Sequence, residues 1–196
     1  MDDKKQVCVL GLGYIGLPTA CVLASVGHAV QGVDTNREIV KMLANHGLHI
    51  YEPGLKELID QATASGRLSF SSEPATADVF VLAVPTPLSD HQSADLQYVR
   101  AATLSIVPYL REGNLVILES TVPPGTLSNT VVPLLETSGL DVGKELFVAH
   151  SPERVLPGKI LRELVENSRV VGGINDESTR RARDLYATFV TGEILC

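Results

Sequence analysis

The sequence has no tryptophan, only three cysteines and no long apolar run. Cys8, Cys21 and Cys196 have neither the spacing of a disulfide framework nor that of a metal site, and the five histidines show no paired spacing either. No stretch reaches the roughly 18 consecutive apolar residues that a membrane span needs, and the polar residues 1–6 are unlike a signal peptide. We therefore expect a cytoplasmic protein with no membrane segment and no bound metal.

Positive charge is also scarce. Lys and Arg number 16 against 23 Asp and Glu, which gives a net charge of −7. This balance argues against a nucleic-acid surface, but it leaves room for an anionic ligand held by local backbone N–H groups and single arginines. With 44% hydrophobic residues, the 196-residue chain is long enough for one well-packed domain, which we expect to span residues 1–196.

The most informative stretch that is present lies near the start. Residues 7–10 are apolar and suit a strand buried on both faces, and Gly11, Gly13 and Gly16 follow with the spacing G-x-G-x-x-G. In this pattern the first glycine allows a tight turn, the second lets the backbone approach a pyrophosphate, and the third lets the next helix pack closely. The small and apolar residues 17–26 predict that helix, with the pyrophosphate at its N-terminus.

An acidic residue follows at the expected distance. Residues 29–33 predict a second parallel strand that ends in Asp34, at about the 20-residue spacing expected of the residue that binds the ribose. Its carboxylate can accept both ribose hydroxyls and would repel a 2′-phosphate, so the sequence favours NAD over NADP. The alternative is that the glycines only form a turn and that Asp34 only caps the next helix.

The rest of the chain alternates between strand and helix patterns. We expect strands over 68–70, 78–84, 114–119, 145–149, 169–171 and 192–195, and helices over 37–45, 55–63, 96–110, 125–135 and 177–189. This alternation predicts an α/β fold: a doubly wound parallel sheet of the Rossmann type.

In such a sheet, ligands bind outside the carboxyl ends of the strands. Three of the expected strands are followed there by loops rich in proline and polar residues, over 85–87, 120–126 and 150–158. Proline-rich loops and Ser or Thr caps are common, so each loop alone could be purely structural. Three on one edge favour a binding site.

Five motifs in order carry a more specific resemblance. They are Gly-Leu-Gly-Tyr-Ile-Gly-Leu-Pro-Thr-Ala (11–20), Val-Asp-Thr-Asn (33–36), Val-Pro-Thr-Pro (84–87), Glu-Ser-Thr-Val-Pro-Pro-Gly-Thr (119–126) and Ser-Pro-Glu-Arg-Val-Leu-Pro-Gly (151–158). Together they resemble the UDP-glucose/GDP-mannose dehydrogenase family over essentially the whole chain. The runs at 49–53, 153–158 and 169–173 look most like its UDP-N-acetyl-D-mannosamine dehydrogenase branch.

The resemblance implies an activity and a set of roles. The family oxidises the C6 hydroxyl of a nucleotide sugar, here a UDP-sugar, to a carboxylate with two NAD molecules. It places the backbone of Tyr14 and Ile15 under the pyrophosphate, and Pro85, Thr86 and Thr121 toward the nicotinamide half. Thr121 would also help to position the hydrolytic water. Glu153 would handle a proton or orient that water near C6, and Arg154 and Val155 would contact the nucleotide sugar. The alternative for Glu153 and Arg154 is a surface ion pair beside a turn.

One departure from the family stands out. Family members continue through a long central helix used for dimerisation into a second domain, and this later part carries a catalytic Lys, an Asn and a nucleophilic Cys. Neither Cys196 nor Lys159 matches those motifs. We therefore expect the isolated chain to be inactive, and a full-length parent to be a homodimer or larger. A free-standing NAD-binding module, and a dehydrogenase of the 3-hydroxyacid or 6-phosphogluconate type, remain as alternatives.

Overall fold

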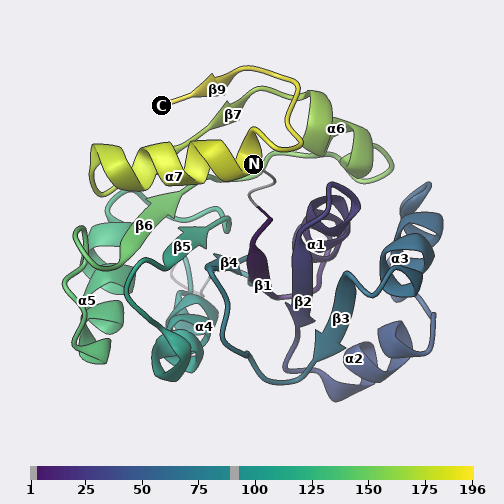
Figure 1. Cartoon of the computed structure of the whole chain (residues 1–196), viewed down its shortest axis with the longest axis horizontal. Coiled ribbons are helices and arrows are strands. Elements are labelled where there is room, and N and C mark those ends of the chain that lie inside the picture. The colour runs from purple at the N-terminus through teal and green to yellow at the C-terminus, as the bar shows by residue number, and fades with distance from the viewer. Residues whose placement is uncertain (1–3, 89–92) are drawn as a thin grey trace.

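A seven-stranded sheet forms the centre of the computed structural model, which describes residues 4–88 and 93–196. Figure 1 shows this sheet with helices on both faces. Six strands are parallel, and the strand order is β3-β2-β1-β4-β5-β6-β8. The parallel strands are β1 (Gln6–Leu10), β2 (Ala29–Val33), β3 (Leu68–Ser71), β4 (Val79–Leu82), β5 (Leu115–Leu118) and β6 (Phe147–His150). This order is that of a Rossmann-type doubly wound fold and confirms the predicted fold class.

Alternate residues of the central strands point to opposite faces of the sheet and pack into two hydrophobic cores. In β1, Val7 and Val9 join one core, and Cys8 and Leu10 join the other. The first core lies under α1 (Gly16–Ser25), α3 (Leu55–Ala64), α6 (Ile160–Glu166) and α7 (Asp176–Tyr186), with Leu43 of α2 (Arg37–Ala44). The second lies under α4 (Gln97–Ile106) and α5 (Val132–Leu135). Burial of both faces explains why these strands are almost entirely apolar.

The strand register aligns the ends that matter for binding. Leu10 is paired with Val33 on one side and with Leu82 on the other, and Leu82 is in turn paired with Leu118. The loops that follow these strands therefore begin at a single edge of the sheet.

The C-terminal strands differ from the expectation. Residues 169–171 and 192–195 do form strands, but β7 (Arg169–Val170) and β9 (Ile194–Leu195) pair with each other in a separate two-stranded sheet. Figure 1 places them beyond α7, away from the main sheet. The edge of the main sheet is instead the antiparallel strand β8 (Gly172–Gly173). A Cβ on Gly173 would lie 2.4 Å from the Thr179 nitrogen, so only glycine lets α7 pack this closely on the edge.

Two helices also differ from the local pattern. The helix expected over 125–135 begins as a π-helical turn, η2 (Leu127–Val131), before α5, and Pro133 breaks the regular ladder because it has no N–H. The helix expected over 96–110 ends in the 3₁₀ turn η1 (Val107–Tyr109), and a second 3₁₀ turn, η3 (Glu136–Ser138), follows α5. Helix α6 was not expected, since its sequence supplies no N-cap side chain.

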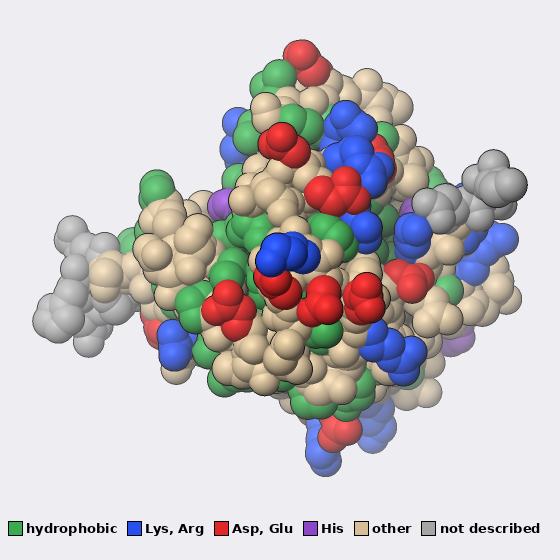
Figure 2. Space-filling view, turned by 60° about the vertical axis from the view of Figure 1, so that its left-hand side comes forward, with side chains coloured by type: hydrophobic (Ala, Val, Ile, Leu, Met, Phe, Trp, Pro, Cys, Tyr) green, Lys and Arg blue, Asp and Glu red, His purple; other side chains and the backbone are tan. Residues whose placement is uncertain are grey.

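The surface mixes charges of both signs. Acidic and basic side chains lie interspersed on the face shown in Figure 2, with no broad patch of one sign. Within residues 4–88 and 93–196, no helix is both long and apolar enough to cross a bilayer.

Candidate functional site

The glycine turn after β1 is packed too tightly for side chains at two positions. Gly11 has φ +90°, donates its N–H to the Val33 carbonyl at 2.8 Å, and would place a Cβ 2.5 Å from the Ala83 oxygen. A Cβ on Gly16 would lie only 1.8 Å from the Gly11 oxygen. These two glycines therefore serve the fold, because they let β1, β4 and α1 approach one another.

Gly13 has a different environment. A Cβ built on it meets no atom within 4 Å. It lies three residues before Gly16, where α1 begins, and a helix N-terminus favours an anion. The structure thus leaves open space at the one glycine that the motif reserves for a ligand.

A cavity of about 610 Å³ opens at this turn, on the carboxyl edge of the sheet. Six of the residues predicted to contact a dinucleotide line it: Gly11, Gly13, Tyr14, Ile15, Asp34 and Pro85. Gly16 lies behind them, and Thr86 and Thr121 are not part of this lining. The structure therefore brings the glycine turn and Asp34, the predicted ribose ligand, into one cavity.

Two backbone hydrogen bonds fix the Asp34 carboxylate. Its Oδ2 accepts the N–H of Leu12 at 2.9 Å, and its Oδ1 accepts the N–H of Asn36 at 2.9 Å. The N-cap of α2 is the Asn36 side chain, which accepts the N–H of Glu38, so the alternative role of Asp34 as the helix cap does not hold. Asp34 thus joins the glycine turn to the end of β2.

The loops after β4 and β5 are joined to each other. The Thr86 hydroxyl donates to the Thr121 carbonyl at 2.8 Å, and the Ser120 hydroxyl donates to the Val84 carbonyl at 2.7 Å. Thr121 itself is exposed. Two of the predicted nicotinamide-side residues are therefore in direct contact with each other.

Glu153 belongs to a buried ionic network rather than a surface pair. Arg169 contacts both Glu153 and Glu119, and its side chain is only 3% exposed. Glu119 accepts from Arg169 at 3.1 Å and from the Tyr186 hydroxyl at 2.8 Å, and the guanidinium lies 4.1 Å from the Tyr186 ring centroid. Burial raises the pKa of the Glu119 carboxyl above its ordinary value, while the Arg169 charge and the Tyr186 hydrogen bond oppose that rise.

Arg154 and Val155 lie beside this network but differ in exposure. The Arg154 side chain is exposed and approaches the Ser168 carbonyl at 3.5 Å, whereas Val155 packs against the first core. Glu153 and Arg154 line a polar hollow of about 270 Å³ with Arg169. Two of the predicted sugar residues, Glu153 and Arg154, therefore line a different hollow from the six predicted cofactor residues.

Comparison with known proteins places this geometry in a family. The model of the UDP-glucose/GDP-mannose dehydrogenase family, NAD binding domain, matches residues 5–190. The chain belongs to this family. The match decides against the 3-hydroxyacid and 6-phosphogluconate alternatives.

Individual relatives point to one branch of the family. The UDP-N-acetyl-D-mannosamine dehydrogenase of Methanococcus maripaludis is 46% identical over 98% of this chain and 44% of that protein. The enzyme of the same name from Methanocaldococcus jannaschii is 47% identical over 97% of this chain and 44% of that protein. The native structure of the UDP-N-acetyl-mannosamine dehydrogenase Cap5O from Staphylococcus aureus superposes with a TM-score of 0.94 at 44% identity, covering 97% of this chain and 47% of that one. The chain thus spans less than half the length of these relatives.

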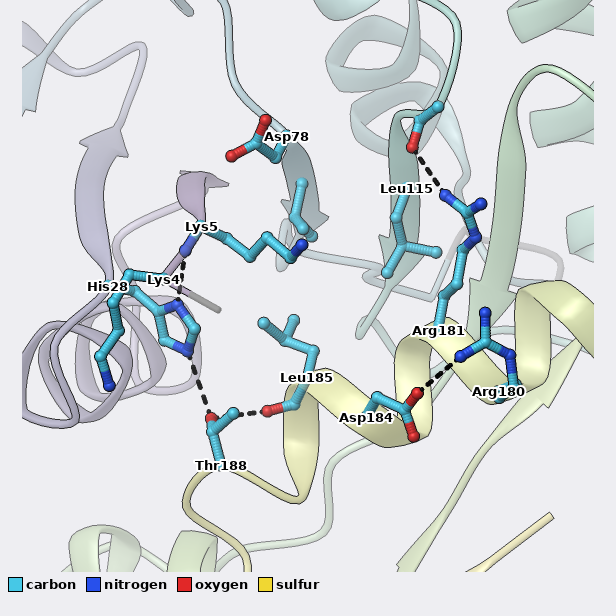
Figure 3. Close-up of a pocket in the computed structure, with 12 residues that line it drawn as sticks. Lys4, Lys5, His28, Asp78, Leu115, Arg180, Arg181, Asp184, Leu185 and Thr188 are labelled. Carbon is cyan, nitrogen blue, oxygen red and sulfur yellow. Dashed lines mark hydrogen bonds and ion pairs between the residues drawn. The ribbon is translucent and has the colours of Figure 1, made fainter. Parts of the chain in front are cut away.

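The opposite rim of this NAD-binding domain has a cavity of a different kind. It measures about 460 Å³ and lies at the amino ends of the strands, against α7 (Figure 3). Arg180 is paired with Glu177 and Asp184, and the Lys4 ammonium donates to the Val26 carbonyl at the end of α1. The described residues that line this cavity include no glycine-rich turn at the start of a helix, which is the feature that binds the pyrophosphate of a dinucleotide in this fold.

Two of the three cysteines are buried in the cores of the domain. Burial raises the pKa of the Cys8 thiol to about 11 and that of Cys21 to about 12, so both are core residues. Cys196 is exposed beyond β9. In the part of the chain that the structure describes, no three His, Cys, Asp or Glu residues gather as metal ligands would.

Several residues of the site were missed by the sequence analysis. Ile39 from α2, and Tyr98 and Ala101 from α4, complete the apolar wall of the 610 Å³ cavity. They belong to ordinary amphipathic helices, and no local signal separates them from core residues. Arg169 was placed in a predicted strand and in the run 169–173 that carries the resemblance, but it was given no ionic role. An arginine at the start of an apolar strand is a sign of a buried charged partner.

Proposed function

We propose that this chain, as one domain over residues 1–196, is the NAD-binding part of a UDP-sugar 6-dehydrogenase, with UDP-N-acetylmannosamine as the sugar nucleotide. The observation that carries the proposal is the 610 Å³ cavity, in which open space at Gly13 meets the start of α1 and the fixed carboxylate of Asp34. The sugar is suggested by the names of the relatives, and the dimeric or larger assembly by the family resemblance.

The residues present fit a dinucleotide along this cavity. The N–H groups around Gly13, Tyr14 and Ile15 would bind the pyrophosphate, and Asp34 would accept the hydroxyls of the adenosine ribose. The apolar wall of Ile39 and Tyr98 suits a purine. NAD supplies the hydride acceptor for alcohol oxidation.

The substrate side is formed by the loops after β5 and β6. Arg154 has an exposed guanidinium that suits the diphosphate of a UDP-sugar, and Val155 gives that loop an apolar anchor. Glu153, held by Arg169, would take up a proton or orient a water near the reacting carbon. Thr121 is exposed and would position that water.

The purified chain should bind NAD but should not reduce it when UDP-N-acetylmannosamine is added. NAD binding follows from the cavity at the glycine turn, and the absence of turnover follows from the proposal that the nucleophile for sugar oxidation lies in a further domain. Calorimetry measures binding, and the absorbance of the reduced cofactor measures turnover. NAD binding without turnover supports the proposal. Turnover would mean that this chain itself contains the nucleophile. A chain that does not bind NAD would contradict the proposal.

Asp34→Asn should weaken NAD binding by about ten- to a hundredfold, since a hydrogen bond to a charged group contributes about 1.5–3 kcal/mol. It should weaken NADP binding much less, because the repulsion of the 2′-phosphate is also removed. Glu38→Gln, an exposed residue in the first turn of α2, is the control for the lost charge. Calorimetry with both cofactors tests this, and an unchanged NAD/NADP ratio would exclude Asp34 as the ribose ligand.

A further inference from the structure

The segment from His49 to Glu52 lines the cofactor cavity with its first two residues, His49 and Ile50. The His49 ring lines the 610 Å³ cavity, and its Nε2 lies 2.8 Å from the carbonyl oxygen of Leu12 in the glycine turn. The next residue, Ile50, is buried in the first core. The segment is therefore in direct contact with the turn that would carry the pyrophosphate.

The last residue of the segment contacts a loop distant in the sequence. Glu52 is only 4% exposed, and its two carboxylate oxygens accept the N–H of Gly158 at 2.7 Å and the N–H of Ile160 at 2.8 Å. Both bonds are to a charged acceptor, and they satisfy N–H groups at the start of α6, which lacks a local side-chain cap. Glu52 thus fixes the far end of loop 151–158.

That loop is held at both ends, by different parts of the domain. Its first half is attached to the core by the contact of Glu153 with Arg169. Between the two anchors, Leu156 and Pro157 are exposed, and the Leu156 N–H donates to the Glu163 carboxylate of α6 at 2.8 Å. The Glu52 anchor lies two residues beyond Ile50 and three beyond His49, and both of these residues line the cofactor cavity.

We propose that Glu52 is a positioning residue that couples NAD binding to loop 151–158, which rests on the proposed role of Glu153 and Arg154 in holding the nucleotide sugar. NAD in the cavity restricts the turn and His49, and the short segment passes that restriction to Glu52 and so to the loop. Because such coupling is reciprocal, a fixed loop also favours NAD.

The first measurement compares Glu52→Gln with Glu57→Gln by hydrogen exchange of the isolated domain. The amide of the new side chain presents N–H to one of the two backbone donors, so one bond is lost and that donor is left unpaired. We expect exchange in 151–160 to become about tenfold faster or more, with segment 5–33 unchanged. Glu57, exposed on α3, loses the same charge and should leave both segments unchanged. If hydrogen exchange became equally faster in all segments, Glu52 would stabilise the whole domain and would not position the loop specifically.

The second measurement adds saturating NAD and includes His49→Phe. In the wild-type domain NAD should slow exchange in 151–160, and this protection should be lost in both variants. His49→Phe should differ from Glu52→Gln by keeping slow exchange in the loop without NAD. An unprotected loop in the NAD-bound wild type, or full protection in Glu52→Gln, would overturn the coupling. Calorimetry on the same samples reads NAD binding separately, so failure of the coupling is distinguishable from failure of the proposed function.

Discussion

Replacing Arg169 with methionine should destabilise the domain by about 3–5 kcal/mol at neutral pH, the range expected when one partner of a buried ion pair is removed. Arg169 contacts Glu119 and Glu153, whose side chains are 0% and 8% exposed, so the variant leaves two buried carboxylates without a cation. The stacking of the guanidinium on Tyr186 is lost as well. Denaturant unfolding of the isolated domain measures the change.

The loss should depend on pH in a direction set by Glu119. Burial holds its pKa above the ordinary value of 4.5, and removal of Arg169 takes away an attraction that opposes this rise. A carboxyl with a raised native pKa binds more protons folded than unfolded, so its unfavourable effect grows as pH rises from about 4.5 through the native pKa. The difference between Arg169→Met and wild type should therefore shrink from pH 8 to pH 5.

A surface arginine gives the matched control. Arg162 pairs with Glu166 at 3.5 Å, and both side chains are more than half exposed. Arg162→Met should change stability by no more than about 0.5 kcal/mol. If the two variants proved equally stable, or if the loss in Arg169→Met were the same at pH 5 and pH 8, the network would not hold ionised carboxylates in the way described.

The contacts of this ionic network could not be predicted from the sequence. Gly11, Gly13, Gly16 and Asp34 could be predicted as binding residues because their spacing reflects the local geometry of one strand–helix–strand unit. Glu119, Arg169 and Tyr186 meet only after three separate elements have packed. No window of sequence contains them together, so their pairing could not be predicted.

The same limit explains the C-terminal elements. The apolar runs at 169–171 and 192–195 were sufficient to predict strands, but not their partners. Helix α6 was not predicted because an N–H group at its start is bound by Glu52, which lies 108 residues earlier in the sequence. The predicted sheet was right where consecutive strand–helix units determine it, and incomplete where distant side chains do.

The fingerprint glycines give the second large effect, since Gly13 and Gly16 have different roles in the motif and differ sharply in their surroundings. Gly13→Val should fold with wild-type stability, because its Cβ meets nothing within 4 Å in the free domain. It should nevertheless weaken NAD binding by about a hundredfold or more, since the branched side chain takes the space that the backbone leaves for the pyrophosphate.

Gly16→Ala should lower the stability of the domain, in contrast to Gly13→Val. Its Cβ would lie 1.8 Å from the Gly11 oxygen, so α1 must move away from the turn, and the cost should be about 1–3 kcal/mol or more, as in other overpacked cores. Thermal unfolding and NAD calorimetry on both variants separate the two roles. Normal stability with normal NAD affinity in Gly13→Val would mean that the dinucleotide lies elsewhere, because a ligand on this turn must contact the added methyl groups. Normal stability in Gly16→Ala would instead show that the close approach of turn and helix is not what the third glycine provides.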